Sequence, residues 1–66
     1  MNDYELGNLM KAIELCFKEN YCAMTFRDLY DKFYPVDYDT LLYAARVLED
    51  NGRLIADGDI IRLVVR

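Results

Sequence analysis

The chain of 66 residues is long enough for one small domain and too short for a second hydrophobic core. Hydrophobic residues make up 55% of it, so we expect apolar packing to stabilise the fold without disulfides or metal. Twelve acidic residues against eight basic ones give a net charge of -4. This charge disfavours plain nucleic-acid binding, because phosphate contacts supply most of the non-specific affinity.

Residue types that usually carry catalysis are scarce. The sequence contains no histidine, and therefore no usual general base, zinc nitrogen ligand, or Ser-His or Cys-His nucleophile pair. Cys16 and Cys22 lack CxxC or metal-ligand spacing, so we interpret them as buried free thiols, with a disulfide between them as the alternative. The closely spaced aspartates do not match an EF-hand pattern. We expect no enzyme activity, no metal and no cofactor.

The N-terminal residues MNDYELGN are polar and acidic. The sequence shows no signal peptide, lipidation motif or transmembrane run. These features predict a cytoplasmic protein.

Apolar residues at three- and four-residue steps predict a first helix over residues 3–19, preceded by a capping box of the form N-x-x-E. Gly7 inside this helix suggests a close contact with a neighbouring element. Asn20 accepts left-handed geometry and is expected to end the helix, after which residues 21–24 are predicted to be extended.

A second capping box, Thr25 with Asp28, predicts a helix over residues 26–34. This helix is expected to stop there because Pro35 disfavours helical geometry in the residue before it. The short turn that follows predicts a steep crossing of the second and third helices, as in a helix-turn-helix.

The third helix, over residues 38–51, has the best-marked ends. Asp37 is its expected N-cap, Val36 and Leu41 are spaced for a hydrophobic staple, and Gly52 accepts a left-handed cap at its end. Its predicted buried residues are Leu41, Leu42, Ala45 and Leu48.

A hairpin of strands 53–56 and 59–65, joined by Asp57-Gly58, completes the domain. The predicted register pairs Ala56 with Asp59, Ile55 with Ile60, and Leu54 with Ile61. The core face would then carry Leu54, Ile61, Leu63 and Val65. The opposite face is apolar enough that a second copy or a partner is expected to cover it.

This order of elements, with the segment LEDNGRLIADGDIIRL at the junction of third helix and hairpin, resembles the winged helix-turn-helix superfamily. The resemblance spans nearly the whole chain and implies a single α+β, winged-helix-like domain over residues 1–66. In DNA-binding members the third helix enters the major groove and the wing contacts the backbone. If these DNA contacts are carried over to this sequence, the positions on the third helix are Tyr38, Asp39, Thr40, Tyr43, Arg46, Val47 and Asp50. The positions on the wing are Asp57 and Asp59.

The residue types at these positions favour a protein over DNA. Only Arg46 on the helix could make the bidentate guanine contact, and the wing aspartates would face phosphates. Tyrosine suits protein interfaces, so Tyr38 and Tyr43 are candidate anchors. We therefore predict a non-enzymatic acidic interaction module for a partner with a basic surface. The predicted partner-binding residues are Asp37, Tyr38, Asp39, Tyr43, Arg46, Asp50, Asp57 and Asp59.

Together with Asp28 and Asp31, these acids suggest a DNA-mimic inhibitor of a nucleic-acid-binding complex, similar in charge and size to phage-type inhibitors of restriction or CRISPR systems. A merely solvated acidic face is an alternative reading. A third is a small dimeric winged-helix transcriptional regulator. It would contact DNA through Thr40, Arg46, Arg53, Arg62 and Arg66.

Overall fold

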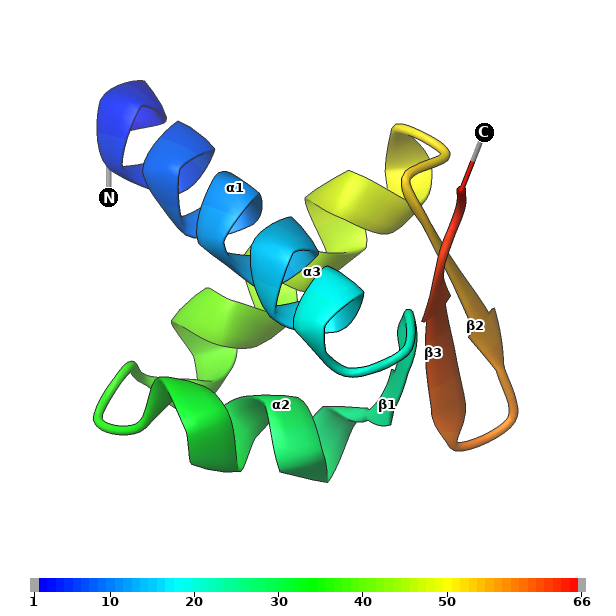
Figure 1. The fold of residues 1–66 in the computed structure, drawn as a ribbon. Helices are drawn as coiled ribbons and strands as arrows, with labels where there is room; N and C mark the ends of the chain where they lie inside the picture. The colour runs from blue at the N-terminus through cyan, green and yellow to red at the C-terminus, as the bar shows by residue number, and fades with distance from the viewer. Residues whose placement is uncertain (1, 66) are drawn as a thin grey trace.

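The computed structural model in Figure 1 describes residues 2–65. Its elements follow in the order α1 (Asp3–Glu19), β1 (Ala23–Thr25), α2 (Phe26–Phe33), α3 (Tyr38–Asp50), β2 (Leu54–Asp57) and β3 (Ile60–Leu63). The three strands form one antiparallel sheet in the order β1-β3-β2, so the predicted α+β class is confirmed. Among the described helices, none has the length and apolar character needed to cross a membrane.

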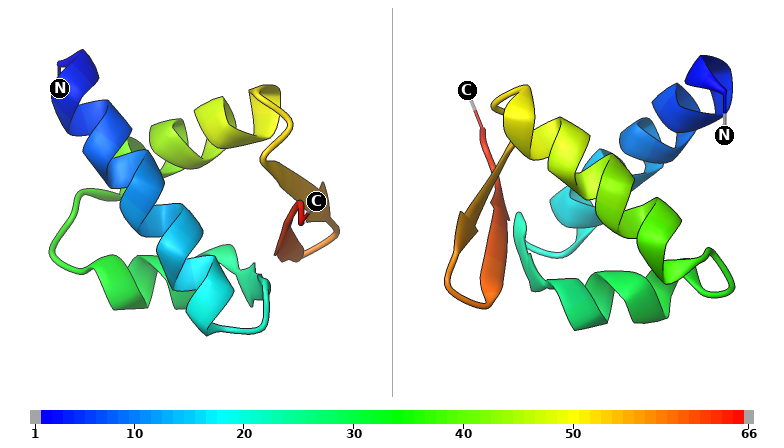
Figure 2. Two further views of the ribbon diagram at one scale, coloured as in Figure 1. Left: turned by 45° about the horizontal axis from the view of Figure 1, so that its top comes forward. Right: turned by 180° about the vertical axis from the view of Figure 1, so that it is seen from behind.

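The three helices pack together, and the sheet stands at one side of them (Figures 1 and 2). Helix α1 crosses α3, while α2 runs beneath both in the view of Figure 1. The hairpin of β2 and β3 extends from the C-terminal end of α3 toward the level of α2.

Each helix begins at the side-chain cap that the sequence predicts. The caps are Asn2 Oδ1 accepting from the Glu5 N–H at 2.8 Å, Thr25 Oγ1 accepting from the Asp28 N–H at 3.1 Å, and Asp37 Oδ2 accepting from the Thr40 N–H at 3.3 Å. Each such bond satisfies a backbone donor that the helix leaves free and stabilises the helix by about 1 kcal/mol. These caps explain why the predicted helix starts are correct.

Helix α3 ends at the predicted glycine. Gly52 has a φ of +73°, its N–H donates to the Glu49 carbonyl at 2.9 Å, and the Arg53 N–H donates to the Leu48 carbonyl at 2.8 Å. This is a Schellman motif, which satisfies carbonyls at the helix end. The helix ends at Asp50, and α2 ends at Phe33, each one residue earlier than predicted.

The end of α1 differs from the prediction. Asn20 has a φ of -120°, and the left-handed residues are Tyr21 (φ 61°) and Cys22 (φ 63°). The Asn20 side-chain amide donates to the Cys16 carbonyl at 2.7 Å, which keeps Asn20 against the helix and moves the reversal one residue on. The extended segment predicted at residues 21–24 is therefore wrong in its first half, and the strand is Ala23–Thr25.

The core collects one side of every element. Its buried residues are Ile13, Phe17, Met24, Leu29, Leu41, Ala44, Ala45, Leu48, Leu54 and Leu63. Ala44 was not predicted, whereas Leu42 is only half-buried. Cys16 and Cys22 are half-buried free thiols, and burial raises the pKa of the Cys16 thiol, with nearby Lys32 lowering it and Glu19 raising it further.

The hairpin register is offset by two residues from the predicted one. Asp57 pairs with Ile60, so the turn consists of Gly58 and Asp59. Gly58 has a φ of +61° and Asp59 is not a positive-φ residue, which matches a turn with glycine at its first central position. The observed pairs are Leu54 with Leu63, Ile55 with Arg62, Ala56 with Ile61, and Asp57 with Ile60.

An offset of two keeps each side chain on its predicted face of the sheet. Leu54 and Leu63 are buried and Ile61 packs partly against the core, as predicted, but Val65 lies beyond the end of β3 and is 70% exposed. Strand β1 pairs with β3, with Met24 opposite Ile61, a pairing that the sequence did not indicate.

Candidate functional site

A groove of about 740 Å³ opens between α3, the hairpin and the start of α2. Its size lies in the range of about 300–1,000 Å³ that is typical of ligand-binding clefts. The apolar lining residues are Phe26, Leu42, Ala45, Ala56 and Ile61, and the charged ones are Arg27, Arg46, Glu49, Asp50 and Asp59. Thr25, Tyr38 and Gly58 complete the lining.

Helix α3 supplies one long wall of the groove through a single stripe of side chains. The stripe consists of Tyr38, Leu42, Ala45, Arg46, Glu49 and Asp50, which follow each other at helical spacing. Of the residues that α3 buries, Leu41, Ala44 and Leu48 lie on a different stripe, whereas Ala45 belongs both to the core and to the groove lining. One helix therefore serves both the core and the groove.

The sheet supplies the opposite wall. Its inner face is covered at the end where Leu54 pairs with Leu63, and both of these side chains are buried. At the next inward-facing pair, Ala56 is exposed and Ile61 is half-buried, and both line the groove. The groove is thus a continuation of the hydrophobic core that no element of residues 2–65 covers.

Tyr38 closes the end of the groove next to α2. Its ring packs edge-to-face on Phe26 at a centroid distance of 5.2 Å and on Tyr30 at 5.5 Å. Each such pair contributes about 0.5–1.5 kcal/mol beyond area burial. The ring is therefore held in place, while 49% of Tyr38 stays exposed and available for contact.

Charged groups of both signs line the rim of the groove and form no ion pair with another described residue. Within residues 2–65 the ion pairs are Arg53 with Glu14 at 3.0 Å and Arg62 with Asp57 at 4.0 Å, and neither involves a residue of the groove. The rim carries three carboxylates against two guanidinium groups. The last turn of α3 contains no basic residue, so Glu49 and Asp50 add to the negative end of the helix dipole.

The structure brings half of the predicted partner-binding residues together. Tyr38, Arg46, Asp50 and Asp59 line the groove. The others lie outside its lining, at exposed positions: Asp37 at the N-cap of α3, Asp39 and Tyr43 on the helix, and Asp57 in its ion pair with Arg62.

Several lining residues were not among the predicted site residues. The position of Leu42, four residues after Tyr38, could have placed it on the same stripe. Phe26 and Arg27 carry no such signal, because the α2 segment reaches the groove only through the tertiary fold. Ile61 was expected in the core and is half-buried at the groove.

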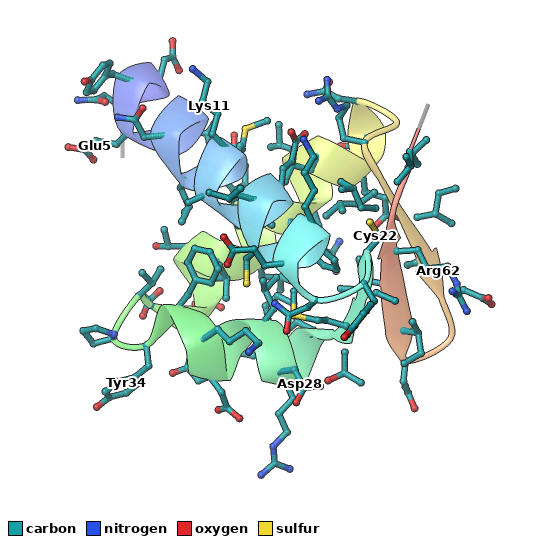
Figure 3. The ribbon with its side chains drawn as sticks, in the orientation of Figure 1. Glu5, Lys11, Cys22, Asp28, Tyr34 and Arg62 are labelled. Carbon is teal, nitrogen blue, oxygen red and sulfur yellow. The ribbon has the colours of Figure 1, made fainter. Side chains whose placement is uncertain are left out.

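The predicted DNA-contacting residues are dispersed. Arg46 lines the groove, but Arg53 is bound to Glu14 of α1, and Arg62 projects from the hairpin away from the helices (Figure 3). The Thr40 N–H is occupied by the cap of α3. Arg66 lies outside the described residues.

The part of the chain that the structure describes contains no group of three or more His, Cys, Asp or Glu residues arranged to hold a metal ion. No protein-family model, curated protein or solved structure matches the chain. The resemblance to the winged helix-turn-helix superfamily accordingly stays a prediction.

Proposed function

We propose that the chain is a non-enzymatic, winged-helix-like interaction module of the cytoplasm that binds a basic protein surface through α3 and the hairpin. The supporting observation is the groove, where three carboxylates and two guanidinium groups, none of them in an ion pair within residues 2–65, surround an apolar floor. Protein interfaces combine an apolar centre with a polar rim. Duplex DNA offers mainly phosphates to such a surface, and the acids repel them.

The acidic surface extends beyond the groove. Asp28, Asp31, Asp37 and Asp39 are exposed on α2 and at the start of α3, and Figure 3 shows Asp28 on the outer side of α2. A net charge of -4 would steer the molecule toward a basic partner. In its sharper form the proposal is a DNA mimic that occupies the nucleic-acid channel of a larger complex and inhibits it.

The first test is a fluorescence-anisotropy titration with mixed-sequence duplex DNA at low ionic strength. The proposal expects no binding. Tight, salt-sensitive binding would refute it in favour of a dimeric DNA-binding regulator, which gains support from Arg27 and Arg46 beside the groove, since neither forms an ion pair within the described residues. An Arg46→Gln variant that lost such binding would assign the contact to α3.

The second test concerns the acids at the start of α3. Because the Asp37 side chain caps the helix, lysine at this position would remove both a charge and a cap. Asp37→Asn with Asp39→Asn removes the charges and retains a capping side chain. We expect this variant to capture a basic partner protein from extracts of the native organism several-fold more slowly. The rate of capture should also depend less on salt concentration.

The matched control for this capture is Asp3→Asn with Glu5→Gln, which removes two exposed acids from the first turn of α1. Equal capture by wild type, variant and control would show that the acids at the start of α3 play no part in binding.

A further inference from the structure

The floor of the groove is an apolar surface that continues the core into solvent. Ile61 lies next to the buried Leu54–Leu63 pair on the same face of the sheet, and Leu42 lies next to buried Leu41 on α3. Both are half-buried, and Ala56 beside Ile61 is exposed. Apolar side chains seated here would complete the packing that these residues leave open.

The groove is asymmetric in charge along α3. The stripe from Tyr38 to Asp50 spans about 18 Å at a rise of about 1.5 Å per residue. Its Tyr38 end is aromatic, with Phe26 packed against the tyrosine ring. Its other end carries Glu49 and Asp50 at the negative end of the helix dipole. A ligand lying along α3 would therefore meet apolar groups first and carboxylates last.

We infer that the groove binds a short segment of a partner protein in which apolar side chains adjoin a lysine or arginine. The apolar side chains occupy the floor at Phe26, Leu42 and Ile61, and the cationic group lies between Glu49 and Asp50 at the end of α3. This inference rests on the proposed function and specifies the segment that the module recognises. Charge complementarity places the cationic end of the segment at the end of α3, and burial of apolar area supplies its affinity.

The charges of the free protein indicate which class of ligand the groove accepts. Glu49 and Asp50 have no ion-pair partner within residues 2–65, although Arg46 precedes them on the same helix. An anionic ligand would meet three carboxylates at the rim and only two guanidinium groups. A purely cationic ligand would leave the apolar floor exposed.

The test uses three peptides with blocked ends, acetyl-Leu-Leu-Arg-amide, acetyl-Leu-Leu-Glu-amide and acetyl-Gly-Gly-Arg-amide, titrated into the ¹⁵N-labelled full chain. The first should shift the amide resonances of Leu42, Ala45, Glu49 and Ile61. It should bind about tenfold more tightly than either of the others, a difference of about 1.4 kcal/mol. Equal affinities for the two Leu-Leu peptides, or shifts confined to other residues, would overturn the inference.

Two double variants separate the position of the acids from the overall charge, and one single variant tests whether the peptide lies in the groove. Glu49→Gln with Asp50→Asn should remove the preference for arginine over glutamate, whereas the control Asp3→Asn with Glu5→Gln, with its acids on α1, should keep it. Ala56→Phe fills the groove from the inner face of the hairpin and should abolish binding of the first peptide, with folding checked by the dispersion of the amide spectrum. Unchanged binding in Ala56→Phe would place the peptide elsewhere.

Titration with duplex DNA distinguishes failure of the groove inference from failure of the proposed function. If the peptides fail to bind and the duplex also fails, the groove inference is wrong while a protein-binding function remains tenable on another face. If the duplex binds tightly, the proposed function itself is wrong.

Discussion

Tyr21 and Cys22 adopt left-handed backbone geometry, with φ values of 61° and 63°. This geometry costs a non-glycine residue about 1–2 kcal/mol. The turn is held by two backbone hydrogen bonds of 2.8 Å, one from the Cys22 N–H to the Phe17 carbonyl and one from the Leu63 N–H to the Cys22 carbonyl. Tyr21 is 99% exposed, so packing of its side chain does not offset the strain.

Tyr21→Gly should therefore stabilise the protein. Glycine relieves the strain but loses about 0.5–1 kcal/mol of backbone entropy, so we expect a net gain of about 0.5–1 kcal/mol. Thermal denaturation should show a rise in melting temperature of about 2–8 °C. The control is Tyr4→Gly, which changes another exposed tyrosine that lies within α1 and should be destabilising. A loss of stability in Tyr21→Gly would show that the tyrosine contributes through contacts.

Asn20 shows why the sequence could not place this turn. Asparagine is a common left-handed residue, so the residue type pointed to Asn20, and Tyr21 gave no signal. Which residue becomes left-handed depends on the hydrogen bond that the Asn20 side chain makes. Its amide donates to the Cys16 carbonyl at 2.7 Å. The three N-caps were predictable because cap and donor lie three residues apart in the sequence.

At the scale of the element, Gly7 in α1 and Gly58 in the hairpin differ in whether the local structure needs a glycine. Gly7 lies within α1, and a Cβ built on it would meet no atom within 4 Å, so the predicted close contact is absent. Gly58 has a φ of +61° in the hairpin turn. Gly7→Ala should stabilise the protein by about 1 kcal/mol through helix propensity.

Gly58→Ala should destabilise the protein by about 1 kcal/mol or more, because alanine is strained at this backbone angle. Urea unfolding followed by circular dichroism measures both changes against wild type. A stabilising Gly58→Ala would contradict the observed turn, since the substitution is tolerated only where φ is negative.

The hairpin register was the least predictable part of the fold. Two different turns, Asp57-Gly58 and Gly58-Asp59, place the same side chains on the core face, because the two registers differ by two residues. The hydrophobic pattern cannot choose between them. The observed register also aligns β3 with β1, where Thr25 pairs with Ile60, and this contact joins segments far apart in the sequence.

The groove was predictable on the α3 side and not on the others. Helical spacing from Tyr38 to Asp50 follows from the sequence, and Asp50 was among the predicted partner-binding residues, whereas Glu49 was not. Phe26 and Arg27 become part of the site only because α2 folds against the start of α3. The half-burial of Ile61 depends on how far α3 covers the sheet, which no local pattern records.

At the scale of the whole molecule, acidic residues lie both at a helix end where the helix dipole favours them and at one where it disfavours them. Asp3 and Glu5 lie in the first turn of α1, where the helix dipole favours acids. Glu49 and Asp50 lie in the last turn of α3, where it disfavours them. The fold would therefore be more stable without the second pair, and a role in binding would account for its presence there.

Two double variants with the same change of net charge test this effect of the helix dipole on stability. Glu49→Gln with Asp50→Asn should raise the free energy of unfolding by about 1 kcal/mol, and Asp3→Asn with Glu5→Gln should lower it by a similar amount. Urea unfolding at low and high salt measures both, and the difference should shrink at high salt because exposed charges are screened. Equal stabilisation by both pairs would mean that overall repulsion dominates over position. A Glu49/Asp50 variant that is more stable yet loses the arginine preference would indicate that these acids serve recognition at the expense of the fold.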